Sequence, residues 1–219
     1  MTLARTERAA LADLLVELGP DQPTLCEGWT TADLLVHLQV RERRPDAMIG
    51  MFLPPLAGWT AKVSARYRER PWQQQIQALR SGPPAYSPLG WGPVDDKANS
   101  MEMFIHHEDA RRGRPGWQPR ELDAPTREQL VAMATSFLAV RGLRKVGVPT
   151  SAELTDEPGG RPRTIVLVPA KGAQQSGGVV LRGGIADILL WLSGRSAVDV
   201  EFVGDPAAVA AVQAGERGV

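Results

Sequence analysis

Two short stretches of the chain carry residues that could bind a metal ion. One is TTADLLVHLQVRERR, which contains His37, and the other is NSMEMFIHHEDARR, which contains Glu102 and His106. If the second stretch is helical, Glu102 and His106 share one face, with Cβ atoms roughly 5–6 Å apart. Two nitrogen donors and one carboxylate form the three-ligand set of catalytic zinc sites, which leaves one position open for water or substrate. A metal site is therefore the first hypothesis.

Each of these residues also has a simpler interpretation. His37 borders an apolar stripe that contains Leu34 and Leu38, and a lone histidine there more often packs in a core than binds a metal. A glutamate and a histidine four residues apart also arise by chance on exposed helices, where the pair stabilises little. However, Glu102 lies in a strongly apolar segment, so its carboxylate must be exposed, paired or bound to a cation.

Two charged neighbours of the histidines have alternative roles. Arg41 follows His37 by one helical turn, so its guanidinium could reach the same cavity and act as a catalytic residue that binds a substrate carboxylate. The alternative is a solvated helix end, where positive side chains offset the negative helix dipole. Asp109 could accept the second N–H of His106, as carboxylates often do behind metal-binding histidines. It could equally form a surface ion pair with Arg112.

The adjacent residues His106 and His107 cannot share one role. Consecutive helical residues point about 100° apart, so only His106 can face Glu102. We therefore expect His107 to lie at the edge of the site or against a neighbouring helix. Its hydrogen-bonding partner would then be Asp95, Asp96 or a backbone carbonyl.

Four further residues are weaker candidates. Cys26 precedes the helix of His37, and the helical residues before His37 alone span roughly 10 Å, so we expect a buried structural thiol rather than a nucleophile. Trp91 lies in a loop and could form a pocket wall. Arg182 and Arg195 flank the last but one predicted helix, and their direction does not follow from the sequence.

Composition and charge exclude several classes of protein. Hydrophobic residues make up 43% and charged residues 23% of the chain, which is ordinary for a globular protein. With 25 basic and 25 acidic residues, no global field attracts nucleic acid or a membrane surface. The single cysteine and the charged N-terminus, which lacks the apolar core of a signal peptide, favour a cytoplasmic location. Phosphate-loop, dinucleotide-binding and serine-hydrolase motifs are absent.

Apolar periodicity predicts that the first two thirds of the chain are helical. Thr30 offers a capping hydroxyl, with Asp33 completing a capping box. The loop 81–93, rich in proline and glycine, could cover the site as a rim or lid. The expected helices cover 3–18, Thr30 to about Arg44, 58–80, 94 to 112, and a segment that begins near Pro125 and ends before Gly147.

The pattern changes after residue 150. Four β-prone segments alternate with two helical ones, the second capped by Asp205. We predict an all-α domain over 1–147, with about five helices, joined to a small α+β domain over 151–219. A core of 69 residues is marginal alone, so the second domain is expected to pack on the first.

Three motifs resemble a known family. The stretches CEGWTTADLLVHLQVRERR and NSMEMFIHHEDARRG resemble the metal-ligand motifs of DinB-like helical bundles, above all the metal-binding domain of the mycothiol-dependent maleylpyruvate isomerase family of actinobacteria. The tail VVLRGGIADILLWLSGR is similar to the sterol-carrier-like α+β domain that accompanies it. The resemblance covers almost the whole chain. It implies an up-down bundle that binds zinc or another divalent ion.

The resemblance also implies a set of ligands and a type of function. In this family the metal ligands would be His37, Glu102 and His106. The implied protein is a metal-dependent enzyme that activates a low-molecular-weight thiol such as mycothiol, as an isomerase or thiol transferase acting on a small molecule. The alternative is a non-catalytic module that binds a small ligand or a partner and holds a structural metal. A monomer or a homodimer fits either.

Overall fold

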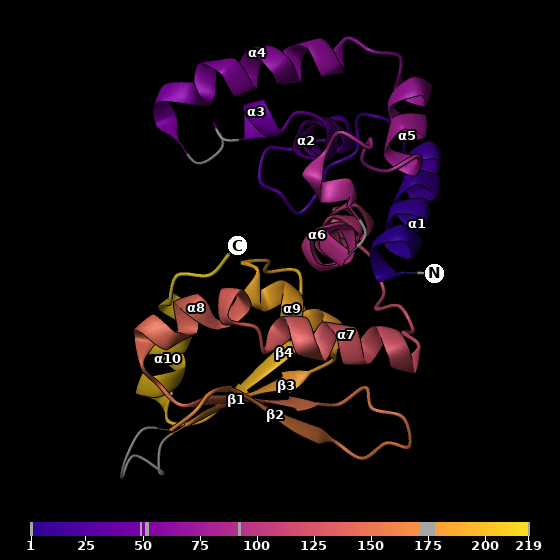
Figure 1. Ribbon diagram of the computed structural model, residues 1–219. Coiled ribbons are helices and arrows are strands. Elements are labelled where there is room, and N and C mark those ends of the chain that lie inside the picture. Colours follow the sequence, from indigo (N-terminus) through magenta and orange to yellow (C-terminus); the bar gives the residue numbers. More distant parts are fainter. Residues whose placement is uncertain (1, 49, 51–52, 92, 171–177, 219) are drawn as a thin grey trace. The chain divides into compact units, whose positions relative to one another are not determined.

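The computed structural model describes residues 2–48, 50, 53–91, 93–170 and 178–218. The chain divides into two compact units, Met1–Pro119 and Arg120–Val219 (Figure 1). The helices of the first unit are α1 (Leu3–Leu18), α2 (Thr31–Arg43), α3 (Pro45–Met48), η2 (Pro54–Leu56), α4 (Ala57–Arg68), α5 (Trp72–Arg80), η3 (Pro88–Gly90) and α6 (Pro93–Arg112), where η marks a 3-10 helix.

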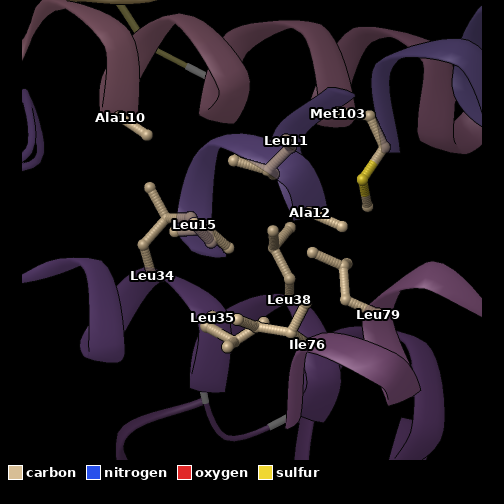
Figure 2. Close-up of a cluster of buried hydrophobic side chains, with 10 residues drawn as sticks. All are labelled: Leu11, Ala12, Leu15, Leu34, Leu35, Leu38, Ile76, Leu79, Met103 and Ala110. Atoms are coloured by element: carbon tan, nitrogen blue, oxygen red, sulfur yellow. The ribbon is translucent and has the colours of Figure 1, made fainter. Parts of the chain in front are cut away.

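The core of the first unit is built by apolar side chains from four helices, α1, α2, α5 and α6. Figure 2 shows how their side chains meet, with α1 between α2 and α6 and with α5 closing one side. This burial of aliphatic side chains is the main force that positions α2 and α6. The cluster consists of Leu11, Ala12, Leu15, Leu34, Leu35, Leu38, Ile76, Leu79, Met103 and Ala110.

Two of the expected helices are each interrupted. The single helix expected over 58–80 is wrong: α4 ends at Arg68 and α5 begins at Trp72. Pro71 lies between them, and a proline inside a helix removes a hydrogen bond and clashes with the preceding turn. The helix expected before Gly147 is likewise two helices, because the Ser136 hydroxyl accepts the N–H of Ala139 and starts a new helix.

The second unit is a four-stranded sheet with helices packed against it. The strand order is β2-β1-β3-β4, with β1 parallel to β3 and the two outer pairs antiparallel. Burial alternates along β1 and β3, so one face of the sheet contributes to the core. The elements are α7 (Ala124–Ala134), α8 (Phe137–Val146), β1 (Thr150–Leu154), β2 (Arg163–Val168), β3 (Val179–Gly183), α9 (Ile185–Leu192), β4 (Val200–Val203) and α10 (Pro206–Ala214).

The predicted fold class is confirmed, whereas the division between the units differs from the expected one. The chain is a helical bundle followed by a small α+β unit, as expected. The expected boundary near 147 assigned α7 and α8 to the bundle. In the structure both belong to the second unit, because α7 packs on α9 and α8 packs on β2 and α9. Among the described residues, no helix has the length and apolarity needed to cross a membrane.

Candidate metal centre

The N-terminus of α2 fixes the position of His37. The Thr30 hydroxyl accepts the N–H of Asp33, and the Asp33 carboxylate accepts the N–H of Thr30 at 2.9 Å. This confirms the predicted capping box, which satisfies two backbone donors and sets the first residue of the helix. Since His37 lies about two turns further on, the cap determines which face of α2 it occupies.

The structure brings His37, Glu102 and His106 together. Their donor atoms all lie within 4.8 Å of one another. Glu102 Oε1 lies 3.2 Å from His37 Nε2 and 3.3 Å from His106 Nε2. The two imidazole rings meet edge to face, with centroids 5.1 Å apart. The side chain of His106 is 9% exposed and that of Glu102 is 26% exposed, so the group is open to solvent mainly on the carboxylate side.

Burial and hydrogen bonding shift the pKa values of the three residues in different directions. Burial lowers the pKa of His37, although its hydrogen bond to Glu102 opposes the effect. Burial would raise the pKa of Glu102, but hydrogen bonds from His106 and His37 hold it well below its usual range. Burial would lower the pKa of His106, but its hydrogen bonds with Asp109, Cys26 and Glu102 raise it well above its usual value. These shifts favour the ionised form of Glu102, the neutral form of His37 and the doubly protonated form of His106.

Two of the three donor separations match those around a divalent ion. Bonds of roughly 2.0–2.1 Å arranged tetrahedrally place ligand atoms roughly 3.3–3.4 Å apart. The separations of Glu102 Oε1 from the two imidazole Nε2 atoms, 3.2 and 3.3 Å, are close to this value. Two imidazoles and one carboxylate are also donors that zinc accepts. An ion that binds here must replace the proton on His106.

Arg41 lies in the site rather than at a solvated helix end. Its Nε is 3.3 Å from Glu102 Oε1, and its side chain is only 14% exposed. Arg41 also donates a hydrogen bond to the side-chain oxygen of Asn99, and the Asn99 amide donates to the carbonyl of Leu89 at 3.0 Å. A chain of polar contacts thus joins the loop before α6 to the carboxylate of the site.

Asp109 supports His106 from the far side of its ring. Its carboxylate accepts the Nδ1–H of His106 at 2.9 Å and is completely buried. Of the two roles predicted for Asp109, the structure shows the hydrogen bond to His106. Arg112, the partner considered in the other role, donates to Glu108 at 2.7 Å. This bond leaves His106 Nε2 directed toward Glu102 and fixes the orientation of the ring.

Cys26 lies closer to the site than the sequence indicated. Its thiol donates to Asp109 Oδ2 at 3.3 Å, and Cys26, His106 and Asp109 form a second close group of donor atoms. Cys26 is partly rather than fully buried, and it reaches His106 because the loop before α2 folds back along α6, where the N–H of Leu25 donates to the Asp109 carbonyl. The thiol therefore lies near the Nδ1 side of His106, and the other candidate ligands lie near Nε2.

His107 faces away from the candidate ligands, as expected, but its partner was not foreseen. Its Nδ1 lies 2.7 Å from Glu7 Oε2 on α1, and both side chains are buried. The side chains of Asp95 and Asp96, the expected partners, lie outside the described part of the structure. Helical spacing places His107 on another face but does not reveal which helix meets that face, so Glu7 was missed.

Within their own units, the three remaining candidate residues have local partners. The side chain of Trp91 is exposed, and its indole N–H donates to the Ala85 carbonyl. Arg182 lies on the sheet of the second unit near Glu153, and Arg195 donates to the Ser193 carbonyl. By contrast Trp29, which precedes the cap of α2, stacks at an angle on His37 with centroids 5.1 Å apart.

Comparison with known proteins identifies the fold. No protein-family model matches the chain, and no curated protein matches its sequence. A crystal structure of the mycothiol-dependent maleylpyruvate isomerase matches with a TM-score of 0.55 and 18% identity, covering 91% of this chain and 90% of that one. At this identity the likeness concerns the fold and does not transfer an activity. Over nearly its whole length, the chain is therefore similar in fold to the mycothiol-dependent maleylpyruvate isomerase.

Proposed function

We propose that the protein is a metal-dependent enzyme in which His37, Glu102 and His106 bind a divalent ion, with zinc as the first candidate. We further propose that it acts on a small molecule together with a low-molecular-weight thiol such as mycothiol, as an isomerase or thiol transferase. The observation that carries the proposal is the convergence of these three donors from α2 and α6 within 4.8 Å of one another, with Glu102 Oε1 3.2 and 3.3 Å from the two imidazole nitrogens. The fold neighbour, which depends on mycothiol, supports the choice of thiol.

The number of donors favours catalysis over a purely structural ion. Structural zinc sites are closed by four protein ligands, whereas catalytic sites have three and an open position. Among the residues that the structure describes, no fourth histidine, cysteine or carboxylate joins this group. A divalent ion bound there would supply a Lewis acid that favours the deprotonated form of a thiol or water.

The chain's own residues would bind and orient the substrate. Arg41 presents a largely buried guanidinium next to Glu102, where it can pair with a substrate carboxylate. Asn99 accepts a hydrogen bond from Arg41 and so limits the positions of that guanidinium. Asp109 keeps the Nδ1 proton on His106, which leaves Nε2 as the atom directed into the site. We infer that Arg41 orients the substrate.

Metal analysis of the protein purified without a histidine tag tests the ligand assignment. We expect about one divalent ion per chain and its loss in His37→Ala and Glu102→Ala, with the fold retained because the aliphatic core does not depend on the ion. Arg41→Gln is the matched control, since it removes a neighbouring charge but no proposed ligand. A protein that holds no ion and shows no thermal shift with zinc, nickel or manganese would contradict the proposal.

A cobalt-substituted sample tests the thiol. Sulfur binding to cobalt adds charge-transfer absorption, so mycothiol or a close analogue should change the spectrum of wild-type protein. Cys26→Ser should give the same change if the thiol comes from outside the chain. An unchanged spectrum with excess thiol would favour the alternative function, a non-catalytic module that binds a small ligand or partner.

A further inference from the structure

A second candidate site is a cavity of about 310 Å³ in the first unit, between α1, the end of α5 and the loop that leads to η3. None of the three candidate metal ligands lines it. Three of its eight lining residues are arginines, two from α1 and one from α5. The complete wall consists of Arg5, Arg8, Ala9, Arg80, Ser81, Gly82, Pro83 and Gly90.

Two of these three arginines have acidic partners, and the third, Arg5, has none in the described part of the chain. Arg8 donates to Glu42 Oε1 through Nε at 3.2 Å and Nη2 at 2.7 Å. Arg80 donates to Asp13 at 2.6 Å, in an exposed pair that water screens. Arg5 forms no hydrogen bond or ion pair with any other residue in the described part of the chain. Arg5 therefore offers a positive charge at the cavity that no described residue pairs with, and an anion bound there would pair with it.

The wall of the cavity is held in place by contacts between the elements that form it. The side chain of Arg8 is only 4% exposed and is fixed by Glu42. Gly82 has a φ of +73°, and a Cβ there would lie 3.7 Å from Cζ and Nη1 of Arg8, so the loop backbone comes close to the guanidinium. Arg43 also holds the end of α5 and the following loop together, because it donates to the carbonyls of Ala78 and Gly82 at 2.6 and 2.8 Å.

We propose that this cavity binds a small ligand through a phosphate group. Guanidinium groups pair with oxyanions through charge-assisted hydrogen bonds, which are stronger than neutral ones. A planar carboxylate suits one or two guanidinium groups, whereas a phosphate offers acceptors in several directions and matches arginines that come from two helices. The volume is at the lower end of ligand pockets, which favours a phosphate with a small organic remainder.

Titration of the metal-free full-length protein with inorganic phosphate at constant ionic strength tests this site. The metal is removed because phosphate also binds divalent ions. We expect saturable binding by calorimetry and amide shifts confined to α1, the end of α5 and the following loop. Arg5→Gln should weaken binding about tenfold, the effect of losing one charged hydrogen bond. Ala9→Leu should abolish it by filling the cavity.

Two controls make the result specific. Arg66→Gln removes an exposed arginine of α4 that does not line the cavity, and it should leave the affinity for phosphate unchanged. Acetate should bind much more weakly than phosphate. The proposal is overturned if binding does not saturate, if Arg5→Gln and Arg66→Gln have equal effects, or if acetate binds as tightly. His37→Ala should keep phosphate binding, so failure of this site and failure of the metal centre are distinguishable.

Discussion

His106 is held between two carboxylates that act on different nitrogen atoms of its ring. Asp109 accepts from Nδ1 at 2.9 Å, and Glu102 lies 3.3 Å from Nε2. The neighbouring His107 instead pairs with Glu7 at 2.7 Å. Two identical side chains in consecutive positions therefore have separate tasks, because the helix turns them about 100° apart. One faces the candidate centre, and the other joins α6 to α1.

We predict that alanine at His106 removes metal binding, whereas alanine at His107 lowers stability. His106→Ala should abolish metal binding, while His107→Ala should keep the metal affinity within about tenfold. His107→Ala should instead lower the free energy of unfolding by about 1–3 kcal/mol, because it removes a hydrogen bond to a buried carboxylate. Metal titration gives the affinity of each variant, and denaturant unfolding gives its free energy of unfolding. The ligand assignment would be contradicted if His107→Ala abolished metal binding and His106→Ala did not.

The affinity for the metal should depend on pH through His106. Hydrogen bonds raise the pKa of His106 well above its usual value, and the metal must displace the proton. At pH values below this pKa, the affinity should fall about tenfold for each unit of pH. His37, whose pKa burial lowers, adds no such loss near neutral pH. Metal titrations at a series of pH values check this, and an affinity that stays constant into the acidic range would disprove it.

At the scale of the elements, one glycine sets the distance between α6 and the loop that precedes α2. Gly113 follows α6, and a Cβ built there would lie 2.1 Å from the carbonyl oxygen of Pro23 and 2.7 Å from Thr24 Cα. Only a residue without a side chain permits this approach. The same contact region holds Leu25 on the Asp109 carbonyl and so places Cys26 near the ring of His106.

We predict that Gly113→Ala lowers the free energy of unfolding by about 1–3 kcal/mol, as overpacking does. It should also weaken metal binding, because displacement of the loop disturbs the surroundings of Asp109. Gly58→Ala is the control: Gly58 lies in α4 with nothing within 4 Å of the built Cβ, so alanine should be neutral or slightly stabilising. Equal unfolding midpoints for both variants would contradict this prediction, because they would show that the loop moves aside with no loss of stability.

Local sequence patterns predicted the elements better than the contacts between them. The Thr30 capping box and the spacing of Glu102 and His106 depend on one helix each, so both could be read directly. The position of Cys26 could not, because helix length limits a distance along the axis but says nothing of a loop that folds back. The break at Pro71 was missed because apolar periodicity continues on both sides of it.

For the whole molecule, the fold class followed from the change of pattern near residue 150, but the division between the units did not. Helices α7 and α8 follow the bundle helices directly in the sequence, and only their packing on α9 and the sheet shows where they belong. The buried pairs of α6 were hidden for a similar reason. Glu108 and Asp109 are fully buried, whereas a polar stretch in a sequence usually indicates an exposed face.

The candidate ligands also lie on both sides of a long segment of the chain. Glu102 follows His37 by 65 residues, and the path between them contains α3, α4 and α5. A bound ion would therefore close a loop, much as a reversible cross-link does. At a free ion concentration of about 100 times the dissociation constant, it would add about 2.7 kcal/mol to the free energy of unfolding. The concentration of free metal would then affect how readily proteases cut the segment between His37 and Glu102, as well as whether the protein is active.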